Sequence, residues 1–162
     1  MATCYTNVFL HFIWQTDHRL PLITPARERS LFRVIRANVQ RAGCQTLALN
    51  AIPDHVHLLA RQGRETTMAA LMHQVKGTSS RFMNAEDDRQ RNAGAAPEDL
   101  PTRPFAWRHG YGVFSVGRTQ VPRIIEYIAN QKHHHEFNAT YPQWETIETD
   151  AIGEKIGEQD IG

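Results

Sequence analysis

Residues 44–61 read CQTLALNAIPDHVHLLAR. Two largely apolar segments, residues 44–52 and 55–61, flank the turn-forming pair Pro53-Asp54, a pattern that predicts a β-hairpin. In the second segment Val56 separates His55 from His57. Because successive side chains of a strand alternate between its faces, we expect both imidazoles to project from one face and Val56 from the other.

The segment before this hairpin predicts a strand and a helix. Residues 5–14 are β-branched and aromatic and are apolar on nearly both faces, as in the central strand of a sheet. Thr24 followed by Pro25 is typical of a helix start, and Gly43 of a helix end. We therefore expect a strand over residues 5–14 and a helix from Pro25 to the residues before Gly43.

The segment after the hairpin predicts two more helices and two short strands. Thr66 or Thr67 begins a helix with a weak point at residues 77–80, and residues 84–104 predict an exposed loop rich in Asn, Asp, Gly and Pro. We expect a strand pair at 105–107 and 111–116, then a helix from Thr119 or Pro122 to about His135. The order β-α-β-β-α-β-β-α predicts an α+β fold, with helices packed on an antiparallel sheet.

Composition and charge narrow the class of protein. The chain has 162 residues, of which 41% are hydrophobic and 22% charged, and no stretch approaches 18 uninterrupted apolar residues, which excludes a membrane span of that kind. The N-terminus lacks the pattern of a secretory signal. Cys4 and Cys44 lack zinc-site spacing, so we expect reduced thiols in a cytoplasmic protein.

Charge is distributed unevenly along the chain. Residues 1–137 carry a net charge of +6, whereas residues 138–162 carry −5. We therefore divide the chain into a domain over residues 1–137 and an acidic C-terminal tail over 138–162, either extended or packed on a partner subunit. A basic body suits a polyanionic partner, although a solvated surface with a solubilising tail explains the charge equally well.

Two groups of residues could carry chemistry. Side-by-side imidazoles at His55 and His57 suit two ligands of one divalent cation, but in a chain with nine histidines such a pair also arises by chance. The second group is Tyr127 and Gln131, one helical turn apart, which offer a nucleophile and a neutral oxygen ligand. Histidines 133–135 follow and could bind metal, but at a helix C-terminus they also complement the helix dipole. The structural role is favoured for His133, whereas His134 could approach the site or the DNA.

These motifs together resemble a known family. The segment PDHVHLL at 53–59 is similar to the histidine-hydrophobe-histidine (HUH) motif of single-strand DNA nucleases. YIANQ at 127–131, followed by His134 and His135, resembles the catalytic helix of the single-tyrosine transposases of small bacterial insertion sequences. Residues 107–116 and 12–19 are similar to other strands of that family, so the resemblance covers about residues 5–137 in the family's order.

The resemblance implies a fold, an activity and a site. The implied fold is a ferredoxin- or RRM-like HUH palm, and the implied domain over 1–137 is catalytic. Tyr127 is implied as the nucleophile that forms a 5′-phosphotyrosine with single-stranded DNA. The implied metal ligands are His55, His57 and Gln131, and the implied cofactor is Mg²⁺ or Mn²⁺. Imidazole ligands suit later transition ions better than Mg²⁺, so Mn²⁺ fits this mixed set better.

The resemblance also implies partners, namely single-stranded DNA with hairpins and a second copy of the chain. In such a homodimer the tyrosine helix of one subunit can complete the site of the other, with residues 117–120 as the hinge. From charge and aromatic character we expect DNA contacts, with a stacking role for the tryptophan, at Arg61, Arg64, Lys76, Arg81, Trp107, Arg108 and His134.

Two other functions remain open from the sequence. One is a domesticated protein that binds DNA hairpins without cleaving them, against which stands the complete set of His55, His57, Tyr127 and Gln131. The other is a metal-dependent phosphohydrolase. The histidine-triad type of hydrolase needs a third alternating histidine, and position 59 is Leu.

Overall fold

The computed structural model describes residues 3–136 of the chain. Within this range a four-stranded antiparallel sheet has the strand order β2-β3-β1-β4. Short 3₁₀ turns lie at 17–19, 97–99 and 118–120. In chain order the strands and α-helices are β1 Phe9–Gln15, α1 Pro25–Arg41, β2 Gln45–Ile52, β3 His55–Arg61, α2 Met68–Asn92, β4 Gly112–Val116, α3 Val121–Ala129 and α4 Gln131–Glu136.

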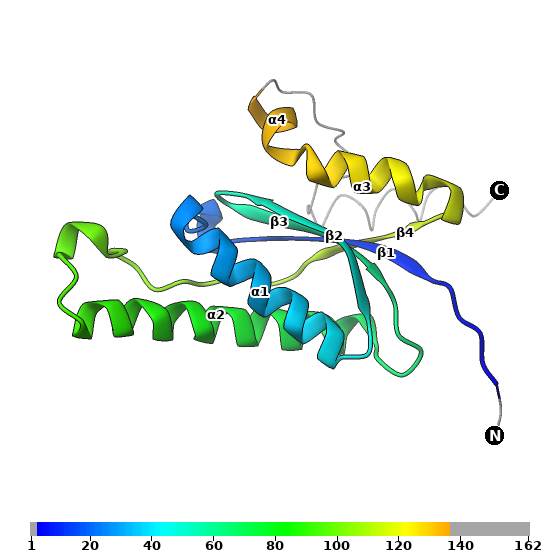
Figure 1. Cartoon of the computed structure of the whole chain (residues 1–162), viewed down its shortest axis with the longest axis horizontal. Coiled ribbons are helices and arrows are strands. Elements are labelled where there is room, and N and C mark those ends of the chain that lie inside the picture. Colours follow the sequence, from blue (N-terminus) through cyan, green and yellow to red (C-terminus); the bar gives the residue numbers. More distant parts are fainter. Residues whose placement is uncertain (1–2, 137–162) are drawn as a thin grey trace, which may run out of the picture.

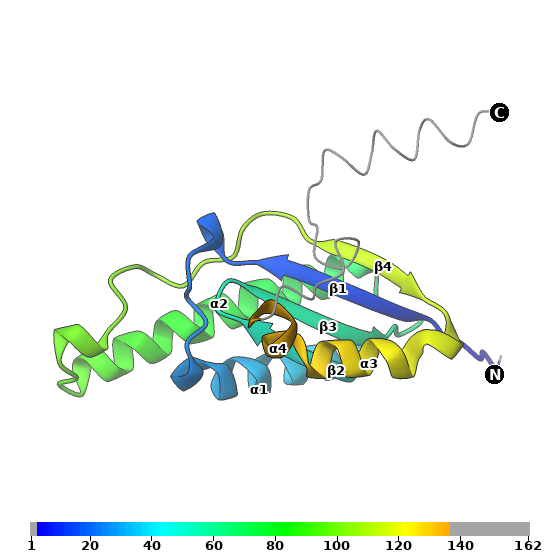
Figure 2. The same cartoon turned by 90° about the horizontal axis from the view of Figure 1, so that it is seen from above.

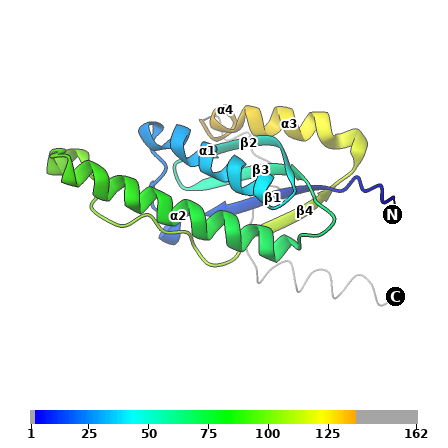
Figure 3. The same ribbon diagram turned by 60° about the horizontal axis from the view of Figure 1, so that its bottom comes forward.

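Helices cover both faces of the sheet (Figure 1). Helices α1 and α2 lie on one face, and α3 and α4 lie on the other, as the view from above and the view with the bottom forward also show (Figures 2 and 3). The predicted α+β fold with helices on an antiparallel sheet is therefore confirmed. Strand β1, which is central as predicted, separates β3 from β4.

The alternation along β3 divides its side chains between the two faces. Val56, Leu58 and Ala60 are fully buried in the main core, which includes α1 and α2 residues such as Ile35 and Leu71. The odd-numbered residues face α3, where Leu59 packs in a second, smaller cluster with Val116, Ile124, Tyr127 and Ile128. The pleat of the strand thus places His55 and His57 on the α3 side of the sheet.

Several local predictions are confirmed. Helix α1 begins at Pro25 after Thr24, and Gly43 follows its end with a φ of +75°, a conformation that glycine adopts without strain. Helix α2 begins after Thr67, whose side chain accepts a hydrogen bond from the backbone N–H of Ala70.

Helix α2 is longer than predicted, because residues 84–92 are helical rather than part of the loop. No break occurs at residues 77–80. A tertiary contact explains the extension. Asp87 is 6% exposed and accepts two hydrogen bonds from Arg27 of α1, at 2.7 and 2.8 Å. Asn84 also exchanges hydrogen bonds with the backbone of Phe105, so this segment has partners that its polar sequence does not reveal.

The prediction of a strand at residues 105–107 is wrong. Phe105 exchanges backbone hydrogen bonds with the side chain of Asn84 on α2, so its N–H and C=O are satisfied outside the sheet. Only a single β-bridge, between Trp107 and Thr16, remains.

The predicted final helix is divided into α3 and α4. It is interrupted at Asn130, where Asn50 of β2 donates to the carbonyls of residues 128 and 129.

Gly63 occupies a position that excludes any side chain. A Cβ atom there would lie in contact with the backbone carbonyl of Gly43, closer than real Cβ contacts allow. We expect Gly63→Ala to lower the free energy of unfolding by about 1–3 kcal/mol, as for other overpacking substitutions. Urea unfolding followed by circular dichroism measures this change. Gly117→Ala, where the nearest atom is 3.8 Å from the added Cβ, is the matched control.

Among residues 3–136, no helix combines the length and the apolar character that a membrane span requires.

Candidate functional site

Two histidines of β3 form the floor of the candidate site. His55 directly follows the tight turn at Pro53-Asp54, and His57 lies two residues further along the strand. Their side chains are almost completely buried, with exposed fractions of 2% and 0%, and their ring centroids are 5.2 Å apart. The predicted projection from one face is therefore what the structure shows.

Each imidazole has a hydrogen-bonding partner at Nδ1. The Nδ1 of His55 lies 2.7 Å from a carboxylate oxygen of Asp54, and the Nδ1 of His57 lies 2.9 Å from Nε2 of His11 on β1. Such bonds fix the orientation of a ring, and when Nδ1 donates they leave Nε2 as the ligand atom. Asp54 and His11 therefore support the metal-binding form of the two histidines.

The Asp54 carboxylate is held in its ionised form. Burial alone would raise its pKa, but the hydrogen bond and charge of His55, together with Arg19, outweigh burial and hold the pKa below its usual value. The Arg19 Nε donates to the second Asp54 oxygen at 3.2 Å. An ionised Asp54 is the stronger acceptor for the Nδ1–H of His55.

Tyr127 lies on α3 and faces these histidines. Its side chain is 4% exposed, and its ring centroid is 6.1 Å from that of His57, with the two rings nearly perpendicular. Ile124 and Ile128 anchor the same face of α3 on the sheet. Asn50 of β2, the cross-strand neighbour of His57, donates to the last carbonyls of α3. It thereby joins α3, which carries Tyr127, to the β2–β3 hairpin, which carries the two histidines.

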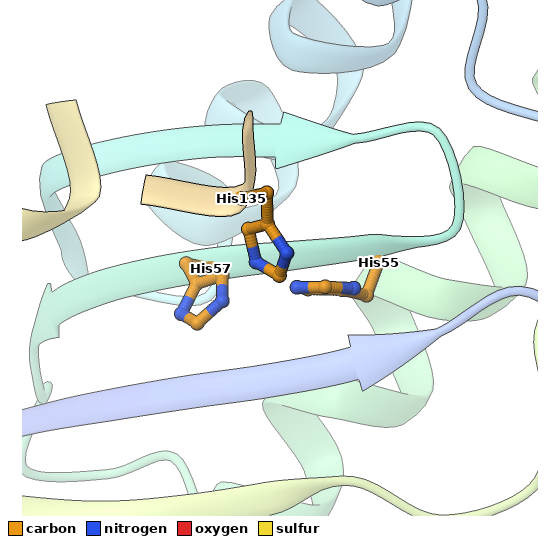
Figure 4. A group of neighbouring side chains, drawn as sticks. All are labelled: His55, His57 and His135. Carbon is orange, nitrogen blue, oxygen red and sulfur yellow. The ribbon is translucent and has the colours of Figure 1, made fainter. Parts of the chain in front are cut away.

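Gln131 and His135 lie one helical turn apart on α4. Gln131 is completely buried, and its Nε2 is 2.6 Å from Nε2 of His135. The His135 ring centroid is 4.9 Å from that of His55. Figure 4 shows the rings of His55, His57 and His135 turned toward a common point between β3 and α4.

The donor set fits a divalent ion. One nitrogen of each of His55, His57 and His135 lies within 4.8 Å of the other two. Imidazole nitrogens that share one ion at about 2.0–2.1 Å are at most about 4.2 Å apart, a difference that small side-chain rotations can close. The structure therefore places candidate ligands for a metal beside the candidate nucleophile.

The structure thus brings together all four predicted site residues: His55, His57, Tyr127 and Gln131 come from β3, α3 and α4 of one chain. The sequence left open whether His135 binds metal or complements the helix dipole, and its spacing of four residues from Gln131 indicates a shared helix face. Asn50 carried no comparable signal. His11 of β1 is a further residue of the site, through its hydrogen bond with His57.

Four of the predicted DNA contacts line one open groove. Between α2 and residues 105–111, this groove contains Lys76, Arg81, Trp107 and Arg108 together with His73 and His109, and no carboxylate is among its lining residues. Burial lowers the pKa of Lys76, whose ammonium donates to the carbonyls of Arg108 and Gly110 at 2.7 Å each. Trp107 donates to Ser79 and packs edge-on against Trp14.

The other predicted contacts lie elsewhere. Arg61 donates to the carbonyl of Thr6, and Arg64 pairs with Glu65 at the surface. The side chain of His134 lies outside the part of the molecule that the structure describes, as does the acidic tail.

The chain matches the model of one known protein family. The family described as IS200-like transposases matches residues 4–131, which include His55, His57, Tyr127 and Gln131. The chain belongs to this transposase family. Among curated proteins, no match was found.

Two solved structures of related fold are similar to this transposase. A chain from Deinococcus radiodurans assigned as a transposase is 25% identical; the match covers 81% of this chain and 96% of that one, with a TM-score of 0.58. A REP-associated tyrosine transposase bound to a REP hairpin is 12% identical, with coverage of 83% and 73% and a TM-score of 0.55. At 12% identity the second likeness concerns the fold alone.

Proposed function

We propose that this transposase cleaves and rejoins single-stranded DNA at hairpin-bearing element ends, with Tyr127 as the nucleophile. The observation that supports this most directly is the position of the Tyr127 ring, 6.1 Å from that of His57 and on the same side of the sheet as His55. A nucleophile beside candidate metal ligands is an arrangement that can catalyse phosphodiester transfer.

The proposed cleavage step conserves the energy of the phosphodiester bond. The phenolic oxygen of Tyr127 loses its proton and bonds to the scissile phosphorus, while the bond from phosphorus to the 3′ oxygen breaks. The 3′ oxygen takes up a proton and departs as a 3′-OH, and the 5′ phosphate stays on the tyrosine. Attack by a 3′-OH on this phosphotyrosine restores a phosphodiester, so rejoining needs no ATP.

The residues proposed to hold Mg²⁺ or Mn²⁺ are His55, His57 and Gln131. A bound ion supplies Lewis-acid polarisation of the scissile phosphate and stabilises charge on the departing 3′ oxygen. Asp54 and His11 orient the two imidazoles through Nδ1. The nearly complete burial of Tyr127 limits access of bulk water, which favours rejoining over hydrolysis.

A labelling experiment tests the proposal. Single strands of the DNA flanking the coding region, folded into their hairpins, are incubated with the protein and Mn²⁺. We expect a 3′-labelled strand to yield a covalent protein adduct that survives denaturing electrophoresis. A 5′-labelled strand should release a free fragment that ends in a 3′-OH. Release of both fragments without an adduct would instead show a phosphohydrolase, and hairpin binding without cleavage would show a non-cleaving binder.

We further propose the basic groove between α2 and residues 105–111 as a contact surface for the DNA hairpin. Its exposed cations, including Arg81 and Arg108, have no carboxylate among the groove-lining residues to neutralise them. The REP hairpin bound by the structural neighbour supports a hairpin as the partner. Arginine and lysine bind nucleic acid mainly through its phosphates, largely independently of sequence.

Salt dependence measures these phosphate contacts. For Arg81→Ala combined with Arg108→Ala, we expect the slope of log K against log [NaCl] for hairpin binding to become shallower by about two, roughly one per lost contact. Fluorescence anisotropy with a labelled hairpin measures this slope. Arg89→Ala with Arg91→Ala is the matched control, because both arginines lie on α2 and pair with acidic neighbours. Equal slopes in the two double variants would exclude the groove.

The domain division and the homodimer with a shared active site remain predictions. Within the single chain, Tyr127 already lies beside the chain's own histidines. We therefore propose that each site can be assembled from one subunit.

A further inference from the structure

His135 occupies a position that the ligand set proposed above does not use. Its half-buried ring meets the His55 ring edge-on, with centroids 4.9 Å apart, and one of its nitrogens lies within 4.8 Å of the ligand nitrogens of His55 and His57. Among residues 3–136, these three form the group of His, Cys, Asp and Glu side chains with metal-ligand spacing (Figure 4).

The position of His135 is set by α4, the short helix that follows the one carrying Tyr127. Gln131 and His135 are four residues apart and share one face of α4. Ring contacts with His57 and His55 place Tyr127 of α3 and His135 of α4 on the same side of the sheet. The amide of Gln131 contacts the His135 ring at 2.6 Å, and Lys132 ties α4 to α1 through an ion pair with Glu28. The His135 ring is therefore held toward the histidines of β3 by contacts on its own helix.

We propose that His135 is a third imidazole ligand of this metal site, in addition to His55, His57 and the amide oxygen of Gln131, so that the centre prefers a first-row transition ion such as Mn²⁺ or Co²⁺ to Mg²⁺. The inference rests on the proposed function only in placing a metal beside Tyr127. Mg²⁺ takes oxygen ligands and loses its water reluctantly, whereas imidazole suits the transition ions. Partners at the Nδ1 atoms of His55 and His57 add to the basicity of those two ligands.

Metal titration without DNA tests this inference independently of cleavage. Metal-free full-length protein is titrated with Co²⁺, followed by its visible absorption, and with Mn²⁺ and Mg²⁺ in a calorimeter. We expect the wild type to bind Co²⁺ and Mn²⁺ at least about tenfold more tightly than Mg²⁺. In His135→Ala we expect affinity for both transition ions to fall by about tenfold or more.

Two controls separate ligation from a loss of structure. His133→Ala changes an exposed histidine of the same helix and should leave the Co²⁺ affinity unchanged. In Gln131→Ala, we expect the Co²⁺ absorption to persist with a smaller loss of affinity than in His135→Ala, because an amide oxygen binds Co²⁺ more weakly than an imidazole nitrogen does. Thermal unfolding of the metal-free variants should match the wild type. A Co²⁺ affinity in His135→Ala equal to that of the wild type would overturn the proposal.

The failure of this inference differs from the failure of the proposed function. Normal covalent adduct formation by His135→Ala, with equal Mg²⁺ and Mn²⁺ affinity in the wild type, would remove the three-histidine centre and leave the transposase chemistry intact. Metal binding that depends on His135, with no adduct on any hairpin strand, would keep the centre and remove the proposed chemistry.

Discussion

Replacing Tyr127 with phenylalanine is expected to abolish the covalent protein–DNA adduct and to reduce strand cleavage by at least about 10³-fold, the scale on which removal of a nucleophile acts. Phenylalanine keeps the ring that packs in the cluster with Ile124 and Ile128, and it removes only the attacking oxygen. Hairpin binding should therefore change little. Denaturing electrophoresis of labelled strands measures the adduct, and anisotropy measures binding.

The matched control for this prediction is Tyr5→Phe. Tyr5 is 82% exposed and belongs to neither the site nor the groove, so its variant should form the adduct as the wild type does. An adduct formed by Tyr127→Phe at the wild-type rate would assign the nucleophile to another residue. Cleavage by Tyr127→Phe with both fragments released would indicate hydrolysis by activated water.

Replacing His57 with alanine is expected to have the second-largest effect. The variant removes a fully buried candidate ligand and leaves His11 without its imidazole partner. We expect Mn²⁺ affinity to fall by more than about 100-fold and adduct formation to fall in parallel, because direct ligands contribute more than the residues that orient them. Calorimetry gives the affinity, and the electrophoretic assay gives the adduct.

His18→Asn is the control for this substitution. His18 is an exposed histidine with a φ of +52°, a conformation that asparagine also tolerates. Its Mn²⁺ affinity and adduct yield should equal those of the wild type. Full adduct formation by His57→Ala in the presence of a chelator would contradict a metal site at His57.

Mixing the two inactive variants distinguishes sites built within one subunit from sites shared between subunits. In a shared dimer, Tyr127→Phe supplies intact histidines and His57→Ala supplies an intact tyrosine, so mixed dimers regain one active site. If each site belongs to one chain, as the 6.1 Å between the Tyr127 and His57 rings suggests, we expect no recovery. Recovery of adduct would establish the exchange of the tyrosine helix.

The sequence predicted those features whose causes are local. The turn at Pro53-Asp54 and the alternation around Val56 predicted the hairpin and the shared face of His55 and His57. The pair Thr24-Pro25 and Gly43 predicted the bounds of α1. Each of these signals acts between residues that are neighbours in the chain, so backbone sterics and side-chain period suffice to interpret it.

Where sequence reasoning failed, a distant partner had replaced the local preference. Asn84 satisfies the backbone of Phe105 and removes the need for a strand there. Arg27 pairs with Asp87, 60 residues away, and the polar segment at 84–92 continues α2. A polar sequence with Asn and Asp favours a loop until such a partner is supplied.

By itself, the sequence determined the paired imidazoles, the helical character of the segments that carry Tyr127 and Gln131, and the order of strands and helices from β1 to α2. Only the tertiary structure decided which face of the sheet those helical segments cover and which groups surround the imidazoles. His11 bonds His57 across 46 residues, and Asn50 caps α3 across 78. The packing of α3 and α4 on the sheet also brings His135 beside His55. These groups lie far apart in the sequence, and no local pattern predicts that they meet.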